Sequence, residues 1–137
     1  MFAMLKLEIV TPEAKIYSED VDMVTLPGVE GEMGIYPMHV PLLTQVAAGE
    51  VVALKGGQDF HLAIGEGFVQ VTGDRVAIMT DMAIKAEDID EKKAEEARLR
   101  AESRLKEKIS DEELATVNAA LLNSLTQLKV KRGRRPM

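Results

Sequence analysis

Apolar and polar residues alternate in short runs through the first part of the chain. In residues 4–10, Leu5, Leu7 and Ile9 alternate with charged residues, which is the two-residue period of a β-strand. Further short runs have strand character: 14–17, 21–26, 42–46, 51–55, 59–64, 68–72 and 75–79. Short strands separated by frequent turns predict an antiparallel β-sandwich, or flattened barrel, over residues 1–86.

The pattern becomes helical after residue 86. Residues 87–109 contain neither Gly nor Pro and consist mainly of Ala, Glu, Lys, Arg and Leu, which favour helix. Ser110, followed three residues later by Glu113, forms a capping box that predicts a second helix over residues 111–130. Because the connection is short, the sequence predicts an antiparallel two-helix hairpin over residues 87–137. The fold class is therefore α+β.

The hairpin has little apolar surface of its own to bury. In the first helix, small residues recur at helical spacing: Ala94, Ala97, Ala101 and Leu105. In the second helix, a stripe of larger residues is expected: Leu114, Val117, Leu121, Leu125 and Leu128. Alanine buries little area, so we expect the hairpin to need the sandwich or another protein to hold it.

One stretch within the predicted sandwich is rich in glycine and proline. Residues 27–41 read PGVEGEMGIYPMHVP. Glycine serves where φ is positive or backbones approach closely, and proline fixes φ. We therefore expect a rigid, sharply turned surface loop or bulged edge that presents Glu30, Glu32 and His39.

This stretch carries a family resemblance. Residues 27–44, P-G-x-x-G-E-x-G-I-Y-P-x-H-x-P-L-L-T, resemble the signature of the epsilon subunit of bacterial F-type rotary ATP synthase, whose mitochondrial counterpart is delta. The order of a strand-rich part followed by a charged helical part extends the resemblance over nearly all 137 residues.

The resemblance implies a non-catalytic central-stalk subunit of the rotor. It implies as partners the gamma subunit, the ring of c subunits and the catalytic beta and alpha subunits. It implies a peripheral protein on the cytoplasmic face of the bacterial cell membrane, with membrane contact only through the complex. Because acidic residues of the family meet the c ring, Glu32 is the best contact candidate and His39 the second, with Glu30 and Gly31 beside them. The family's helical arm extends along gamma and inhibits ATP hydrolysis.

Charge is unevenly distributed along the chain. The net charge is −6, and the excess of acidic residues lies in residues 1–86, which argues against nucleic-acid binding there. Basic residues gather at the end of the chain: Lys129, Lys131, Arg132, Arg134 and Arg135. No aromatic residues lie between them, so we interpret them as a regulatory basic tail suited to acidic protein surfaces.

The residues that catalysis would require are scarce. The chain has no cysteine and two histidines, and it lacks metal-ligand spacings, a nucleophile elbow and a phosphate-binding loop. We expect no metal site and no enzyme activity from the chain alone. His61 is expected on a half-exposed strand face. For His39, a structural hydrogen bond to the turned backbone and a partner contact remain equally open.

A possible nucleotide site lies at the start of the first helix. Some epsilon subunits bind ATP through Ile/Leu-Asp-x-x-Arg-Ala, and residues 89–94 here read IDEKKA. Lysine in place of arginine keeps the charge but loses the planar fork of donors. One interpretation is a capped, solvated helix start without a cofactor, which we favour. The other is a weak regulatory ATP site, and in the alternative function the hairpin of an ATP-sensing module closes on nucleotide. Its residues would be Ile89, Asp90, Lys93, Ala94 and Arg100.

Overall fold

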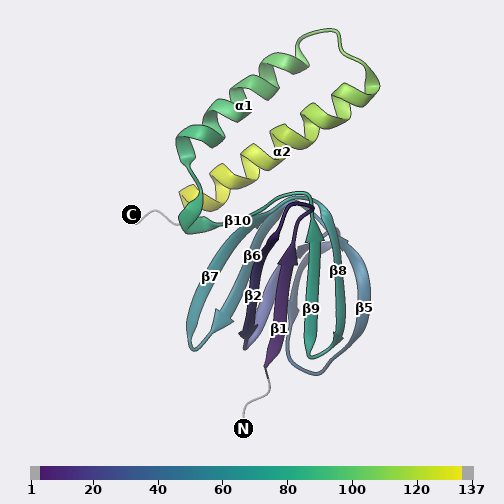
Figure 1. Ribbon diagram of the computed structural model, residues 1–137, viewed down its shortest axis with the longest axis vertical. Helices are drawn as coiled ribbons and strands as arrows, with labels where there is room; N and C mark the ends of the chain where they lie inside the picture. Colours follow the sequence, from purple (N-terminus) through teal and green to yellow (C-terminus); the bar gives the residue numbers. More distant parts are fainter. Residues whose placement is uncertain (1–3, 134–137) are drawn as a thin grey trace.

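The computed structural model describes residues 4–133. Its strands follow one another along the chain: β1 (Leu5–Val10), β2 (Lys15–Val21), β3 (Met23–Gly28), β4 (Gly31–Ile35), β5 (His39–Val46), β6 (Gly49–Lys55), β7 (Gln58–Ile64), β8 (Gly67–Gly73), β9 (Arg75–Thr80) and β10 (Ala83–Lys85). The 3-10 helix η1 (Ala86–Asp88) leads to α1 (Glu91–Leu105) and α2 (Asp111–Gly133). The predicted sandwich followed by a helical hairpin is confirmed (Figure 1).

The strands form one sheet that curls almost closed. Their order is β10-β7-β6-β3-β5-β8-β9-β1-β2, with β4 paired to β3 outside this path. All pairings are antiparallel except that of β1 with β9, which is parallel. The first strand therefore lies between β2 and β9, although β9 is far away in the sequence.

The alternating residues of the strands make the core. Leu5, Leu7 and Ile9 are fully buried, as their two-residue period predicts. They pack with aliphatic residues from the other strands, including Val24, Leu26, Val51, Leu62, Ile64, Val69, Val71, Val76 and Ile78. The inward side of the sandwich is thus a continuous aliphatic core.

Two strands were not predicted. β4 lies within the stretch that we expected to be a surface loop or a bulged edge, and it pairs with β3 from Val24↔Ile35 to Gly28↔Gly31. β10 is only three residues long and pairs with the end of β7. Of the two expectations for residues 27–41, a turned loop or a bulged edge, the loop is wrong for residues 31–35, which form a strand beside β3.

Both helices begin at capping side chains, and the Ser110 cap of the second helix is the predicted one. The Asp90 carboxylate accepts a hydrogen bond from the Lys93 amide at 3.1 Å, and the Ser110 hydroxyl accepts one from the Glu113 amide at 3.2 Å. The second helix, however, continues to Gly133. Lys131 and Arg132 are therefore helical residues rather than part of a tail, and Arg134 and Arg135 lie outside the described residues.

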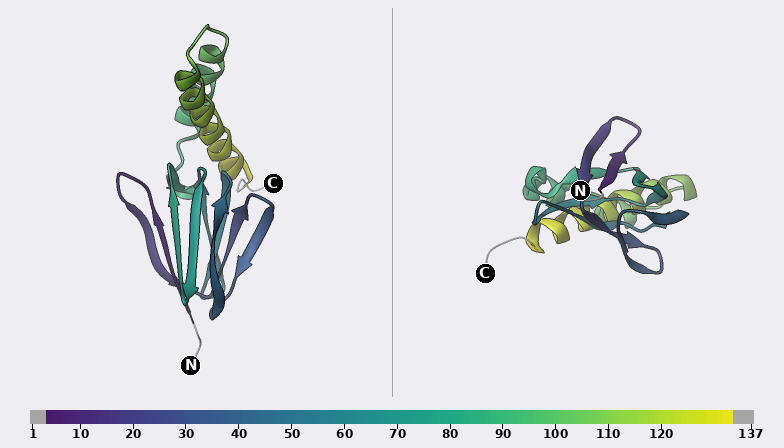
Figure 2. Two further views of the ribbon diagram at one scale, coloured as in Figure 1. Left: turned by 90° about the vertical axis from the view of Figure 1, so that its right-hand side faces the viewer. Right: turned by 90° about the horizontal axis from the view of Figure 1, so that it is seen from below.

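The hairpin stands on one end of the sandwich (Figure 2). Val130 near the end of α2 packs with Ala63, Ala86 and Ile89, and Met82 and Ile84 border this cluster. The predicted small-residue face of α1 turns inward, with Ala94 and Ala101 buried. Of the expected leucine stripe on α2, Leu128 is buried, whereas Leu114 and Leu125 remain exposed. The half of the hairpin nearest its loop projects away from the strands.

Candidate functional site

An acidic tip forms where β3 turns into β4. Gly28 pairs with Gly31, and a Cβ atom on Gly28 would lie 2.7 Å from the Gly31 carbonyl oxygen. Gly31 has φ of 133°, a conformation that favours glycine. This tight turn exposes Glu30, Gly31 and Glu32 at the end of the sandwich that carries the hairpin.

His39 lies at the opposite end of the sandwich. β4 runs the length of the domain away from the acidic tip before the chain turns at Pro37 and Met38. Met38 has φ of 64°, and its amide donates to the Asp74 carboxylate at 3.2 Å. The His39 Nδ1 atom lies 2.7 Å from the Val40 carbonyl oxygen, which is the backbone bond of the structural interpretation. Glu32 and His39 therefore do not form one contact surface.

The residues of the possible nucleotide site have structural roles at the base of the hairpin. Asp90 caps α1, while Ile89 and Ala94 are 4% and 5% exposed and pack inward. Lys93 and Arg100 are exposed, and their spacing of seven residues places them on the same side of the helix. The local geometry is that of a capped helix start with two cations above it.

Ion pairs join the two helices at both ends of the hairpin. At the base, Arg132 of α2 reaches Glu91 at 2.8 Å and Glu95 at 3.2 Å. Arg98 also pairs with Glu95, and together the two arginines lower the pKa of the Glu95 carboxyl, with Arg98 contributing more. Near the loop, Arg104 pairs with Glu113 at 2.5 Å. Ion pairs therefore join two helices that bury few large side chains: α1 buries Ala94 and Ala101, and α2 buries Ser124, Thr126, Leu128 and Val130.

Few contacts attach the hairpin to the strands. The Lys131 amine donates to the Ala86 carbonyl oxygen at 3.2 Å, and the Asn123 amide reaches the Asp81 carboxylate at 3.5 Å. Gly65 has no side chain, which lets Asp81 and Asn123 come close: a Cβ there would lie 2.8 Å from the Asn123 side-chain oxygen. The attachment is a small apolar platform with polar contacts around it.

A groove of about 680 Å³ separates α2 from the rim of the sandwich. Glu32 of β4, Glu50 of β6 and His61 of β7 line its sandwich side. Lys129 and Gly133 line its helix side. The His61 side chain is 25% exposed, as a half-exposed strand residue should be, and lies 3.2 Å from the Glu50 carboxylate. We call this space the acidic groove.

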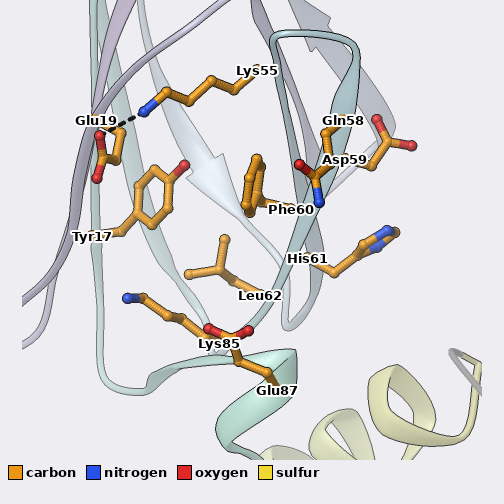
Figure 3. A pocket seen from close by; sticks show the side chains of 10 residues that line it. All are labelled: Tyr17, Glu19, Lys55, Gln58, Asp59, Phe60, His61, Leu62, Lys85 and Glu87. Atoms are coloured by element: carbon orange, nitrogen blue, oxygen red, sulfur yellow. Dashed lines mark hydrogen bonds and ion pairs between the residues drawn. The ribbon is translucent and has the colours of Figure 1, made fainter.

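A second pocket marks the seam where the curled sheet fails to close. It holds about 220 Å³ and is lined from β2 by Tyr17 and Glu19 and from the other side by Lys55, Phe60 and Lys85, among others (Figure 3). Lys55 bridges the seam to Glu19 at 2.9 Å, which lowers the pKa of Glu19 and raises that of Lys55. Burial raises the pKa of the Tyr17 phenol. The ion pair between Lys55 and Glu19 thus links the two sides of the seam.

An apolar stripe crosses the outer face of the sandwich. Phe68 of β8 lies directly opposite Met79 of β9, and Leu43 of β5 is diagonal to Phe68. Leu43, Phe68 and Met79 are 68%, 50% and 45% exposed, which is unusual for neighbouring large apolar residues on a free surface. The alternating sequence pattern predicted these residues only as strand positions. Phe68 and Met79 are next to buried Val69 and Ile78 in the sequence, so the alternation of a strand places them on the outer face. That alternation was the sequence signal for an exposed apolar surface. We call these residues the outer stripe.

Within residues 4–133, no group of three or more His, Cys, Asp or Glu side chains converges in a way that could hold a metal ion. None of the helices in that range combines the length and apolar character that a bilayer crossing requires.

Known families match both parts of the chain. The beta-sandwich domain of the ATP synthase Delta/Epsilon chain matches residues 4–86. The long alpha-helix domain of the same chain matches residues 87–132.

Curated relatives cover nearly the whole length. An ATP synthase epsilon chain from Herpetosiphon aurantiacus is 45% identical over 131 residues, with 96% of each chain covered. One from Dehalococcoides mccartyi is 44% identical over 134 residues, covering 97% of this chain and 96% of its own. One from Desulforamulus reducens is 38% identical over 124 residues, covering 90% and 94%.

Solved structures share the fold. A chain in the cryo-EM structure of the Euglena gracilis mitochondrial ATP synthase, comprising OSCP, F1 and c-ring, matches with a TM-score of 0.72 at 26% identity, covering 90% of this chain and 79% of that one. A chain of the central stalk and c-ring of the Tetrahymena thermophila enzyme matches with a TM-score of 0.57 at 11% identity, covering 93% and 96%. This second likeness concerns the fold alone.

Proposed function

Because the chain belongs to the delta/epsilon family of ATP synthase subunits, we propose that it serves as a non-catalytic subunit of the rotor. It would link the gamma subunit to the c ring during proton-driven ATP synthesis, and its hairpin would restrain ATP hydrolysis at the catalytic beta and alpha subunits. In a bacterial cell it would act at the cytoplasmic face of the membrane, held there by the complex.

The outer stripe is the observation that carries this proposal. Leu43, Phe68 and Met79 expose their side chains side by side on a rigid sheet, and covering them with a partner would remove apolar area from water. A sheet face with a solid core behind it transmits force without deforming. We assign the outer stripe to the gamma subunit.

The acidic tip is the second part of the proposal. Glu30 and Glu32 are exposed on a turn that Gly28 and Gly31 hold tightly, so their carboxylates are presented in a fixed position. We assign this tip to the polar loops of the c ring. His39, at the other end of the sandwich, no longer belongs to the same surface and is the competing candidate.

Binding to gamma tests the first assignment. We expect Phe68→Glu to weaken binding of purified gamma by about thirtyfold or more, because truncating or charging a central apolar contact costs at least about 2 kcal/mol. Phe60→Glu is the matched control, since Phe60 is 38% exposed in the seam on another part of the sandwich. Equal loss in both variants, or loss in neither, contradicts the assignment.

Proton coupling tests the second assignment. In membrane vesicles we expect Glu32→Lys to reduce ATP synthesis driven by proton flow while the sandwich stays folded. Glu13→Lys, which reverses another exposed carboxylate at the same end of the domain, should leave synthesis unchanged. If Glu32→Lys has no effect and His39→Glu abolishes coupling, the c ring contacts the other end.

For nucleotide, we propose that ATP binds weakly or not at all. Asp90 is occupied as a helix cap, and Lys93 supplies a point charge rather than a fork of donors. The exposed pair Lys93 and Arg100 is what favours the alternative of an ATP-sensing module. Calorimetry on the isolated chain decides between them, because micromolar or tighter affinity would support the alternative.

A further inference from the structure

The side chain of Tyr17 ends in an unpaired hydroxyl at the edge of the core. Tyr17 is 8% exposed and packs within the aliphatic core cluster. Within residues 4–133, its hydroxyl neither donates nor accepts a hydrogen bond. The side-chain nitrogen and oxygen atoms of these residues that lie out of reach of solvent all have partners, so the Tyr17 oxygen must open onto the pocket of about 220 Å³ that it lines. We call this space the seam pocket. A buried hydroxyl without a protein partner is available to bond a molecule that enters the pocket.

Apolar side chains line the inner part of the seam pocket. The rings of Tyr17 and Phe60 lie on opposite sides of it, with Leu62 between them (Figure 3). Leu62 is 1% exposed and Phe60 is 38% exposed, so the core opens to solvent here. The side chains of Asp59 and His61 point away from this space. A volume of about 220 Å³ is smaller than the roughly 300–1,000 Å³ of sites for drug-sized ligands, so a ligand here must be small.

Two lysine amines extend toward Tyr17 from either side of the seam pocket (Figure 3). Lys55 donates to Glu19 at 2.9 Å, and an ammonium group has three N–H donors, so it can bind a further acceptor. The Lys85 amine has no ion pair or hydrogen bond within residues 4–133. The pKa of Glu19 is lowered first by its hydrogen bond from Lys55 and then by the charges of Lys55, Lys6 and Lys85, so the positive potential of these lysines reaches this place. Glu87, the remaining carboxylate near the pocket, is exposed on η1.

The donors of the seam pocket select an acceptor. Burial raises the pKa of the Tyr17 phenol, so at neutral pH the hydroxyl keeps its proton and donates it. A carboxylate suits a phenol and an ammonium group together, because hydrogen bonds to an ionised acceptor are the strong ones. The apolar lining in turn favours a hydrocarbon body on the same molecule.

We propose that the seam pocket binds a small hydrophobic monocarboxylate. The carboxylate accepts hydrogen bonds from the Tyr17 hydroxyl and the Lys55 amine, and the hydrocarbon body packs on Phe60 and Leu62. The Lys85 amine adds attraction at longer range. Bound there, the ligand joins β2 to β7 across the seam. The site is a property of the isolated chain and does not depend on the rotor assignment.

Tyrosine fluorescence of the full chain reports on this site. The chain has two tyrosines and no tryptophan, so Tyr36→Phe leaves Tyr17 as the one strong fluorophore. Tyr36 is 61% exposed, so its hydroxyl can be removed without disturbing the core. We expect 3-phenylpropanoate to quench Tyr17 saturably, with Kd on the order of 1 mM for so small a molecule. Quenching follows because the excited phenol loses energy through a hydrogen bond to a carboxylate.

Two control ligands separate the charge from the hydrocarbon body. The alcohol 3-phenylpropan-1-ol has the same body without the charge, and acetate has the charge without the body. Each should bind about tenfold more weakly than 3-phenylpropanoate, because each forgoes one part of the recognition.

Two variants test the named donors, and an exposed lysine on α1 provides the control. Lys85→Gln should weaken binding about threefold, as the loss of an exposed ion pair does. Tyr17→Phe, followed by NMR because it removes the fluorophore, should weaken binding about fivefold through the loss of one hydrogen bond. Its hydroxyl has no partner in the described protein, so the variant should fold normally. Lys92→Gln should leave the affinity unchanged.

Any of three results overturns the proposal. The absence of saturable quenching by 3-phenylpropanoate would mean that the seam pocket holds water alone. Equally tight binding of 3-phenylpropan-1-ol would mean that the carboxylate is not recognised. An affinity that neither Tyr17→Phe nor Lys85→Gln changes would place the ligand elsewhere on the chain.

Discussion

The sandwich and the hairpin are stabilised in opposite ways. The sandwich buries a continuous aliphatic core, in which residues such as Leu7, Leu26 and Ile78 are fully covered. In the hairpin, α1 buries Ala94 and Ala101, and α2 buries Ser124, Thr126, Leu128 and Val130. Ion pairs join the two helices, Arg132 to Glu91 at the base and Arg104 to Glu113 near the loop. Exposed ion pairs add little to the stability of the hairpin. Each helix is stabilised separately by the side chain that caps its first turn. The sandwich is therefore stabilised by one large core, whereas the hairpin is held by smaller and weaker contacts.

Removing the hairpin should produce the largest functional change. A chain ending at Ala86 keeps the whole core cluster of the sandwich, so it should fold, bind gamma and support ATP synthesis. In the assembled complex it should abolish inhibition of ATP hydrolysis. Hydrolysis rates with full-length and shortened chains measure this. Failure to assemble, or equal inhibition with both chains, would make the hairpin a structural part of the complex.

Matched leucine truncations should separate the two regions by stability. Leu26→Ala in the core should lower the free energy of unfolding of the sandwich by about 2–5 kcal/mol, because it leaves a cavity. Leu125→Ala on α2, where the side chain is 44% exposed, should cost less than about 1 kcal/mol. Urea unfolding followed by circular dichroism gives both values. A similar loss of free energy of unfolding in both variants would contradict the difference in stability between the sandwich and the hairpin.

A wedge between the helices should open the hairpin without disturbing the strands. Ala101 is 6% exposed in the interface between α1 and α2, and Ala101→Leu should destabilise that interface by about 1–3 kcal/mol through overpacking. Hydrogen exchange should rise for amides of α1 and stay unchanged in the sandwich. Leu99→Ala, on an exposed side of the same helix, is the control. Faster exchange in the strands as well would mean that the two parts unfold together.

The smallest effect should come from acid. The pKa of Glu95 is lowered, chiefly by Arg98 and then by Arg132, so its pairing stabilises the hairpin above the ordinary carboxyl pKa of about 4.3. That contribution is lost as pH falls through the lower pKa of the folded state. Exchange of α1 amides should therefore rise below about pH 4. This rise in exchange should be smaller in Glu95→Gln. If exchange depends on pH in the same way in both chains, Glu95 is not the group that makes the hairpin sensitive to acid.

Local patterns made much of the fold predictable. The two-residue period located the buried faces of most strands, and Ser110 identified the start of the second helix because capping depends on neighbours in sequence. β4 was missed because Gly31 and Gly34 interrupt the alternation on which strand prediction relies. The hydrogen bonds that make it a strand come from β3, which lies across a turn.

The surfaces were less predictable because they join distant segments. Glu32 and His39 are close in sequence, yet β4 carries them to opposite ends of the sandwich. The acidic groove brings Glu32, Glu50 and Lys129 together from β4, β6 and α2. The spacing of these three residues in the sequence gives no indication that they lie close together. The roles of these residues toward partners remain predictions.

The parallel pairing of β1 with β9 has a consequence for how the chain folds. Lys6 pairs with Arg75, and the Arg75 guanidinium reaches the Glu8 carboxylate at 2.6 Å. During synthesis the first two strands can form only an isolated ribbon, which is marginal in water, until residues 75–80 have left the ribosome. Closing so long a loop costs entropy before the contacts compensate for it, so the pairing of β1 with β9 should be the slow step in forming the sheet.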